Sequence, residues 1–280
     1  MGSFKWYTIF MDLTWDIHHI VMYSGGIGSW AVAKRVVEQY GSDKVTLLFS
    51  DVRGSSTNEH AGEDPDTYRF IEETTKKLGA KLVTLSDGRN IWEVFKDEKM
   101  LGNSRLALCS RILKQEPAKK YLKENFDPET TFIYLGIDWT ESHRLEGAKL
   151  RYSPYNVSAP LINPPYLTKK DMLKMCEDEG IKPPALYERG YAHNNCGGGC
   201  VRAGQGSFKH LLEDNPERFK FWEEKEKEMQ ELLGNPDVTI LRKQENKKRT
   251  ALSLEDLRKT IQSKNKIDED DIGGCGCFLD

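Results

Sequence analysis

The sequence lacks a long hydrophobic run and has little net charge. No uncharged apolar stretch approaches the ~20 residues that span a bilayer, and residues 1–20 contain no basic region followed by an apolar one. We therefore expect a cytoplasmic protein with no membrane partner. The net charge of −3 provides no global field that attracts nucleic acid. The basic run at 242–249 is interpreted as a solvated face, so nucleic acid is not indicated as a partner.

No internal repeat is present, and 280 residues suffice for one large domain or a nucleotide domain with an appendage. Short β-prone runs alternate with segments of helical periodicity. The predicted strands are 20–23, 45–49, 81–85 and 131–137, and the predicted helices are 29–40, 66–78, 109–124 and 168–179. This alternation predicts an α/β fold with a doubly wound parallel sheet. We expect a nucleotide-binding domain at 1–181 and a smaller, Cys-containing helical module at 182–280.

A glycine-rich turn follows the first predicted strand. Gly25, Gly26 and Gly28 allow close approach of a phosphate, and the hydroxyls of Ser24 and Ser29 can donate hydrogen bonds to it. The turn lacks the lysine of a Walker loop and the full spacing of a dinucleotide fingerprint. The alternative is a turn whose glycines serve packing alone.

The turn Ser24-Gly25-Gly26-Ile27-Gly28-Ser29 resembles the Ser-Gly-Gly-x-Asp-Ser PP-loop of the adenine nucleotide α-hydrolase superfamily, with Gly28 in place of the aspartate. That superfamily includes ATP pyrophosphatases and sulfonucleotide reductases. Further stretches are similar to the phosphoadenosine phosphosulfate (PAPS) reductase branch: Cys109–Lys114 with Pro117, Pro160–Ile162 before Thr168–Asp171, and Pro184–Tyr187 with Gly190-Tyr191. The resemblance covers roughly residues 20–205. It implies a Rossmann-like PP-loop fold and a site for ATP or a related adenylyl nucleotide, with Mg²⁺ offsetting phosphate charge.

Several side chains are candidates for this site. Arg111 and Lys114 are three residues apart and are predicted to share a helix face that binds phosphate or sulfate, although a surface basic pair is the alternative. Asp51 and Asp138 end two predicted strands, where they would either contact the nucleotide or cap a helix. In the loop after the fourth strand, His143 could donate a proton and Arg144 could clamp an anion. Ser29 is the loop residue on which catalysis is expected to depend.

The cysteines are clustered. Cys196, Cys200, Cys275 and Cys277 form two glycine-flanked pairs that could hold Zn²⁺ or an iron–sulfur cluster, or act as a reversible dithiol. Cys109, at the start of a predicted helix, could be a nucleophile, a cluster ligand or an inert buried thiol. Sulfonucleotide reductases carry a reactive cysteine in a Glu-Cys-Gly-x-His segment, whereas this chain ends Cys275-Gly276-Cys277-Phe278.

These features lead to a primary hypothesis of a PP-loop enzyme acting at the α-phosphate of an adenylyl nucleotide. The reaction would be of the adenylation or pyrophosphatase type and could be coupled to sulfur transfer. Its partners would be an unidentified acceptor and a thiol or sulfur donor protein. One alternative is a reductase of PAPS or adenosine phosphosulfate. Another is a noncatalytic nucleotide- or metal-binding module.

Overall fold

A computed structural model describes residues 17–103, 106–245 and 248–274, so Cys275 and Cys277 lie outside the described residues. Its centre is a five-stranded sheet with the order β3-β2-β1-β4-β5, in which every neighbouring pair is parallel. The strands are β1 (His18–Met22), β2 (Val45–Asp51), β3 (Lys81–Ser86), β4 (Thr131–Tyr134) and β5 (Asn156–Ser158). The predicted α/β fold with a doubly wound parallel sheet is confirmed.

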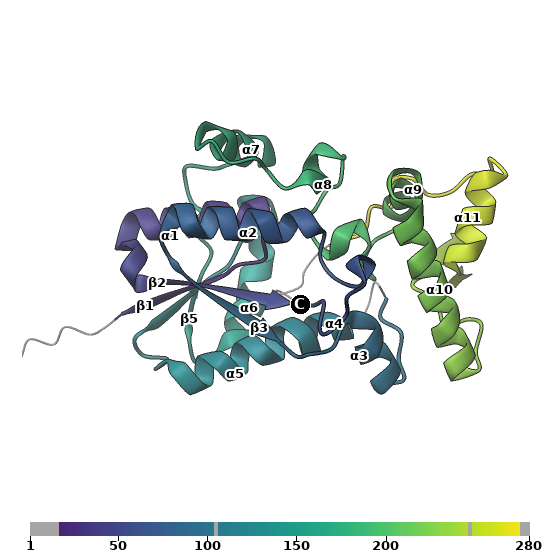
Figure 1. The fold of residues 1–280 in the computed structure, drawn as a ribbon, viewed down its shortest axis with the longest axis horizontal. Coiled ribbons are helices and arrows are strands. Elements are labelled where there is room, and N and C mark those ends of the chain that lie inside the picture. Colours follow the sequence, from purple (N-terminus) through teal and green to yellow (C-terminus); the bar gives the residue numbers. More distant parts are fainter. Residues whose placement is uncertain (1–16, 104–105, 246–247, 275–280) are drawn as a thin grey trace, which may run out of the picture.

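Helices cover both faces of this sheet because its central strands are apolar on both sides. Val21 and Tyr23 pack toward α1 and α2, whereas Ile20 and Met22 pack toward α5 and α6. Figure 1 shows α1 and α2 on one face and α5 on the other. These helices are α1 (Ile27–Tyr40), α2 (Pro65–Leu78), α5 (Glu116–Asn125) and α6 (Leu145–Tyr152).

Local signals set several helix ends. Asp64 caps α2, and Thr168 forms a capping box with Asp171 at the start of α7 (Lys169–Asp178), as its position in the sequence predicts. The segment expected to be one helix from residue 109 is less regular. It comprises α4 (Leu108–Ser110), a π-helical turn (Arg111–Gln115) and then α5.

The C-terminal helices gather beyond the end of the sheet toward which the β1 arrow points (Figure 1). They are α9 (Gln205–Asp214), α10 (Pro216–Leu233) and α11 (Leu254–Gln262), with the antiparallel hairpin of β6 (Leu241–Glu245) and β7 (Lys248–Leu252). Trp222 of α10 shares a hydrophobic cluster with Trp92 of α3 (Ile91–Asp97). The division at residues 181 and 182 stays a prediction. In the described part of the chain, no helix is long and apolar enough to cross a membrane.

Candidate functional site

A pocket of about 320 Å³ lies at the carboxyl ends of β1 and β4. In the strand order 3-2-1-4-5, the connections after these two strands leave toward opposite faces of the sheet, and ligands bind at such a switch point. The predicted site residues that line the pocket are Ser24, Gly26, Gly28, Ser29, Lys114, Asp138 and Arg144. The structure therefore brings together residues that lie far apart in the sequence.

The glycine-rich turn places the N-terminus of α1 at this pocket. Gly25 has φ +77°, and a Cβ there would lie 2.7 Å from Thr67 Cγ2, so no other residue fits without a shift. The Ser29 hydroxyl donates to the Gly26 carbonyl over 2.8 Å. A Cβ at Gly28 would meet only the Gly136 carbonyl oxygen, at 3.6 Å, which is ordinary van der Waals contact. The fold thus has room for a side chain where the PP-loop aspartate is missing.

Two residues that the sequence analysis did not single out hold the loop from the C-terminal side. The Tyr187 hydroxyl, from α8 (Ala185–Glu188), accepts from the backbone N–H of Ile27 over 3.1 Å. The buried Asn194 amide donates to the Gly25 carbonyl over 2.9 Å and accepts from the Thr67 hydroxyl over 3.2 Å. Only the tertiary structure shows these contacts, because each spans more than one hundred residues along the chain.

The predicted pair of Arg111 and Lys114 does not converge on one ligand. The Lys114 ammonium is 3.2 Å from the Glu63 carboxylate, and their side chains are only 6% and 1% exposed. Arg111 is exposed and pairs with Glu116. The π-helical turn explains this difference from the prediction, since its wider winding moves residues three apart off the common face of an α-helix. Glu63 is not among the predicted site residues, because its polar loop carries no local signal of burial.

The loop after β4 contributes polar groups to one wall of the pocket. Asp138 caps the short 3-10 helix Trp139–Arg144, accepting from Thr140 N over 2.8 Å, and it also lines the pocket. Arg144 lines it too and is 2.7 Å from the Glu141 carboxylate. His143 is exposed and does not line this pocket.

Asp51, at the end of β2, also lies outside the residues that line the pocket. Its carboxylate accepts from the Tyr68 hydroxyl over 2.7 Å and from the Arg53 N–H over 3.0 Å. The Arg53 guanidinium lies over the Tyr68 ring, 4.6 Å from its centroid. These local contacts give Asp51 a structural role in the described residues.

Lys169 and His193 add basic groups that the sequence analysis did not select. Lys169 Nζ lies 4.5 Å from the centroid of the Tyr187 ring and donates to the Ala192 carbonyl over 2.6 Å. Burial of the ammonium lowers the pKa of Lys169, and burial followed by the charge of Lys169 lowers the pKa of His193. Both residues line the pocket, so with Lys114 and Arg144 it is lined by basic side chains from four separate segments.

A second, much smaller cavity adjoins this pocket, and Lys114 lines both. Cys109, Cys196 and Cys200 also line the small cavity. A hydrogen bond with Cys200, burial and the nearby Glu63 carboxylate together raise the pKa of the Cys196 thiol well above its usual value. The backbone N–H of Cys196 donates to that same carboxylate.

Within the described ranges, no set of three or more His, Cys, Asp or Glu side chains is arranged to hold a metal ion. The proposed four-cysteine site includes Cys275 and Cys277, which lie outside those ranges. The adjacent residue Gly274 donates its N–H to the Arg202 carbonyl over 3.2 Å, and the Arg202 N–H is 3.4 Å from Cys200 Sγ. The chain thus reaches the neighbourhood of Cys200 just before residue 275.

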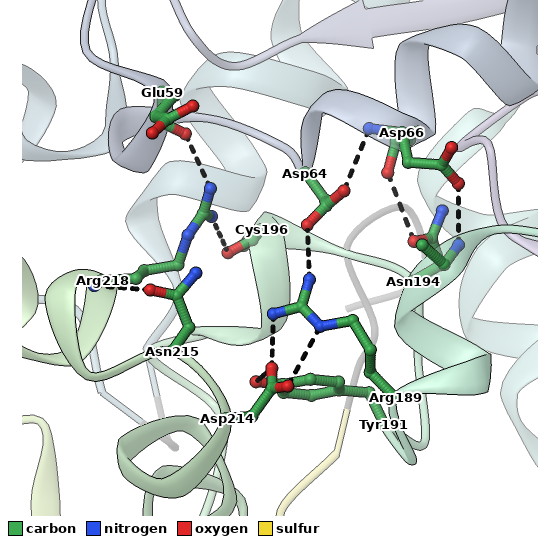
Figure 2. A network of polar contacts seen from close by, with 12 residues as sticks. Glu59, Asp64, Asp66, Arg189, Tyr191, Asn194, Cys196, Asp214, Asn215 and Arg218 are labelled. Carbon is green, nitrogen blue, oxygen red and sulfur yellow. Dashed lines mark hydrogen bonds and ion pairs between the residues drawn. The ribbon is translucent and has the colours of Figure 1, made fainter.

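A buried arginine stabilises the cysteine loop. Arg218 of α10 is 2% exposed, and its guanidinium donates to the carbonyls of Glu59, Gly62 and Cys196 over 2.7, 3.3 and 3.3 Å. Figure 2 shows this arginine beside a second cluster in which Arg189 bridges Asp64 and Asp214. A Cβ at Gly197 would lie 1.3 Å from a terminal nitrogen of Arg218, so the glycine permits the guanidinium to approach.

A parallel 3-2-1-4-5 sheet with a glycine-rich turn before its first helix defines a domain of the nucleotide-related PP-loop class. The chain belongs to the phosphoadenosine phosphosulfate reductase domain family, an enzyme family whose model matches residues 18–198.

Individual relatives are more distant. An uncharacterized protein of Methanocaldococcus jannaschii is 28% identical over 123 residues, which are 44% of this chain and 23% of that protein. The chain thus matches about a quarter of that relative's length. A phosphoadenylyl-sulfate reductase structure from Candida auris, a phosphate complex, superposes with a TM-score of 0.40 at 16% identity, covering 61% of this chain and 78% of that one.

Proposed function

We propose that the pocket between β1 and β4 binds ATP or a related adenylyl nucleotide and that the chain acts at its α-phosphate. The observation that supports this most directly is the N-terminus of α1 at the pocket, with Ser24, Gly26, Gly28 and Ser29 in the lining. A helix N-terminus presents N–H groups and a positive dipole end to an anion. Lys114, Arg144 and Lys169 add positive charge around the same volume.

These residues have separate roles in the proposal. The loop N–H groups and Ser29 orient the phosphate, and Arg144 stabilises charge that develops on its oxygens. Lys114 contributes positive charge to the pocket wall, and its ion pair with Glu63 fixes the position of the ammonium group. Asp138 and Glu141 are the described carboxylates that line the pocket, and such oxygen ligands suit Mg²⁺. When bound with the nucleotide, that ion would offset phosphate charge.

Binding and turnover test this proposal separately. Calorimetry with ATP and Mg²⁺ should show binding that weakens in Ser29→Ala, whereas Ser142→Ala, an exposed serine outside the pocket lining, should bind as the wild type does. Pyrophosphate release, measured with candidate acceptors present, should depend on Ser29 in the same way. An unchanged affinity in Ser29→Ala would contradict the proposed phosphate position.

A second candidate is reduction of a sulfonucleotide, which the family membership supports to the same degree. The specific observation in its favour is that Cys109, Cys196 and Cys200 line a cavity sharing Lys114 with the nucleotide pocket. A thiol donor protein would then supply reducing equivalents. Sulfite formation from PAPS or adenosine phosphosulfate under anaerobic conditions would support this function. Pyrophosphate release from ATP without any sulfite formation would favour the first.

The four-cysteine proposal also remains open to measurement. Anaerobic purification followed by a visible spectrum and analysis for iron, sulfide and zinc distinguishes a cluster, a zinc site and a dithiol. Loss of the bound metal in Cys196→Ser would support ligation by this residue. A metal-free wild type would contradict a metal site and favour the dithiol.

A further inference from the structure

A second cleft, of about 370 Å³, lies between the β6–β7 hairpin and the segment 202–205. We call it the hairpin cleft and define it by Arg202, Gln205, Arg242, Gln244, Arg249 and Asp271, which are among its lining residues. It shares none of its lining with the nucleotide pocket. The function proposed above therefore does not account for it.

The base of the hairpin is firmly anchored in the core. Leu241 and Leu252 pair across the two strands and are both buried in the C-terminal cluster. The buried Glu226 carboxylate accepts from the backbone N–H of Ile240 over 2.8 Å and of Leu254 over 2.6 Å. The residues on both sides of the hairpin are thus hydrogen-bonded to the same buried carboxylate, which fixes the position of the charged strands.

Side chains alternate between the faces of a strand, so Arg242 and Gln244 share a face with Arg249 of the partner strand. Arg242 and Arg249 are exposed and make no side-chain hydrogen bond or ion pair in the described part of the chain. The exposed arginines elsewhere in the described residues are paired: Arg53 with Asp51 and Arg111 with Glu116. An unneutralised pair of guanidinium groups on one face of a ribbon favours an anionic ligand.

The wall opposite the hairpin carries both signs of charge. Arg202 lies there with the carboxylates of Asp268 and Asp271, and Lys243 of β6 also lines the cleft. The Asp271 carboxylate already accepts from the backbone N–H of Gln205 over 3.3 Å. Arg202 also lines the thiol cavity with Cys109, Cys196 and Cys200. A ligand in the hairpin cleft would therefore lie next to the thiols.

We propose that the hairpin cleft binds the phosphate backbone of a nucleic acid and holds it beside the thiol cavity. Arg242, Arg249 and Arg202 would each contact a phosphate, because a guanidinium fork matches phosphate oxygens in a bidentate manner. Gln244 is exposed and offers an amide group that can both donate to and accept from base edges, whereas Gln205 is buried and its amide oxygen already accepts from the Asp268 N–H. Two-stranded ribbons are an established nucleic-acid-reading element. The exposed side chains of the cleft lack the aromatic anchors typical of protein–protein hot spots.

This proposal goes beyond the nucleotide site and is an alternative to the interpretation of residues 242–249 as a solvated face. The global charge of −3 does not exclude phosphate binding in the hairpin cleft, because such binding depends on the local field within about a Debye length. The two exposed arginines of the hairpin, Arg242 and Arg249, lie on the same face of it.

Fluorescence anisotropy with a labelled 20-nucleotide single strand, as DNA and as RNA, tests the proposal. Three phosphate contacts imply an affinity that falls about 20-fold between 50 and 200 mM salt, from a slope of about −0.7 per contact. Arg242→Gln/Arg249→Gln should weaken binding at least about 10-fold at 50 mM salt and reduce that slope by about 1.4. The matched control Lys149→Gln/Lys174→Gln removes two exposed lysines from α6 and α7 and should bind as the wild type does.

Three results would overturn the proposal: no binding by the wild type at 50 mM salt, equal losses in the two double variants, or displacement by polyglutamate as effective as by unlabelled nucleic acid. The last result would indicate an acidic protein partner. Pyrophosphate release from ATP should be the same in Arg242→Gln/Arg249→Gln as in the wild type. Pyrophosphate release thus tests the nucleotide pocket and anisotropy tests the hairpin cleft, so either proposal can be contradicted while the other is supported.

Discussion

The close approach of Arg218 to Gly197 predicts a strong energetic coupling between these residues. Arg218→Ala removes the hydrogen bonds that Arg218 donates to the carbonyls of Glu59, Gly62 and Cys196, of which the Cys196 carbonyl retains a bond from the Gly199 N–H over 3.1 Å. At roughly 1–3 kcal/mol for each unsatisfied acceptor, less the burial cost that the guanidinium no longer incurs, the free energy of unfolding should fall by about 3 kcal/mol. That burial cost is real, because burial lowers the pKa of Arg218 and its Nε has no partner in the described residues.

Gly197→Ala must displace the guanidinium, since the new Cβ would lie 1.3 Å from one of its nitrogens. It also places a Cβ at φ +61°, which costs a further 1–2 kcal/mol or so. We expect a total of about 4 kcal/mol in the wild-type background. In the Arg218→Ala background only the backbone cost remains, so the same substitution should cost about 1 kcal/mol. The double-mutant cycle should therefore give a coupling energy of about 3 kcal/mol.

Urea denaturation of the wild type, the two single variants and the double variant measures this coupling. Circular dichroism and tryptophan fluorescence follow the unfolding. Arg258→Ala is the matched control, because Arg258 forms a partly exposed pair with Glu223 and its loss should cost less than about 1 kcal/mol. A second readout is alkylation of Cys196, which should accelerate when its loop loses Arg218. A coupling energy below about 1 kcal/mol would refute the assignment of Arg218 as the group that stabilises this loop.

Three further predictions concern stability and reactivity. Burial raises the pKa of Glu226 to about 7. The contribution of the protonated carboxyl to the free energy of unfolding is complete below about pH 4.5 and is lost as the pH rises through 7. The free energy of unfolding should therefore fall by about 3 kcal/mol between pH 5 and 8. Urea titrations at the two pH values should show this loss for the wild type and little of it for Glu226→Gln. An equal change in the free energy of unfolding with pH in the two proteins would contradict the raised pKa. Gly25→Ala should weaken both folding and nucleotide binding, because its Cβ would lie 2.7 Å from Thr67, whereas Gly28→Ala should fold normally. Calorimetry measures the effect on binding and urea denaturation the effect on stability. Equal stability of the two variants would argue against the close packing of Gly25. Iodoacetamide at pH 8 should modify the half-buried Cys200 before the buried Cys196, whose pKa is raised; peptide mass spectrometry gives the order, and faster modification of Cys196 would be inconsistent with its burial.

Local sequence patterns predicted much of the sheet domain. The strand, glycine turn and helix around residues 24–29 are contiguous, so short-range signals suffice to identify them. The irregular helix after residue 108 was not predictable in this way, because apolar and polar residues there suit an α-helix as well as a π-helical turn. The predicted convergence of Arg111 and Lys114 depended on that regularity.

The sequence by itself determined the α/β class, the glycine-rich turn and its position at the end of the first strand, because each follows from the order of neighbouring residues. The tertiary structure decided which distant residues surround that loop. It placed Tyr187 and Asn194 on the loop backbone and paired the buried Lys114 with Glu63. It also assembled Cys109, Cys196 and Cys200 around one cavity and set the hairpin arginines beside it. Such contacts depend on the packing of segments far apart in the chain, and local periodicity carries no information about that packing.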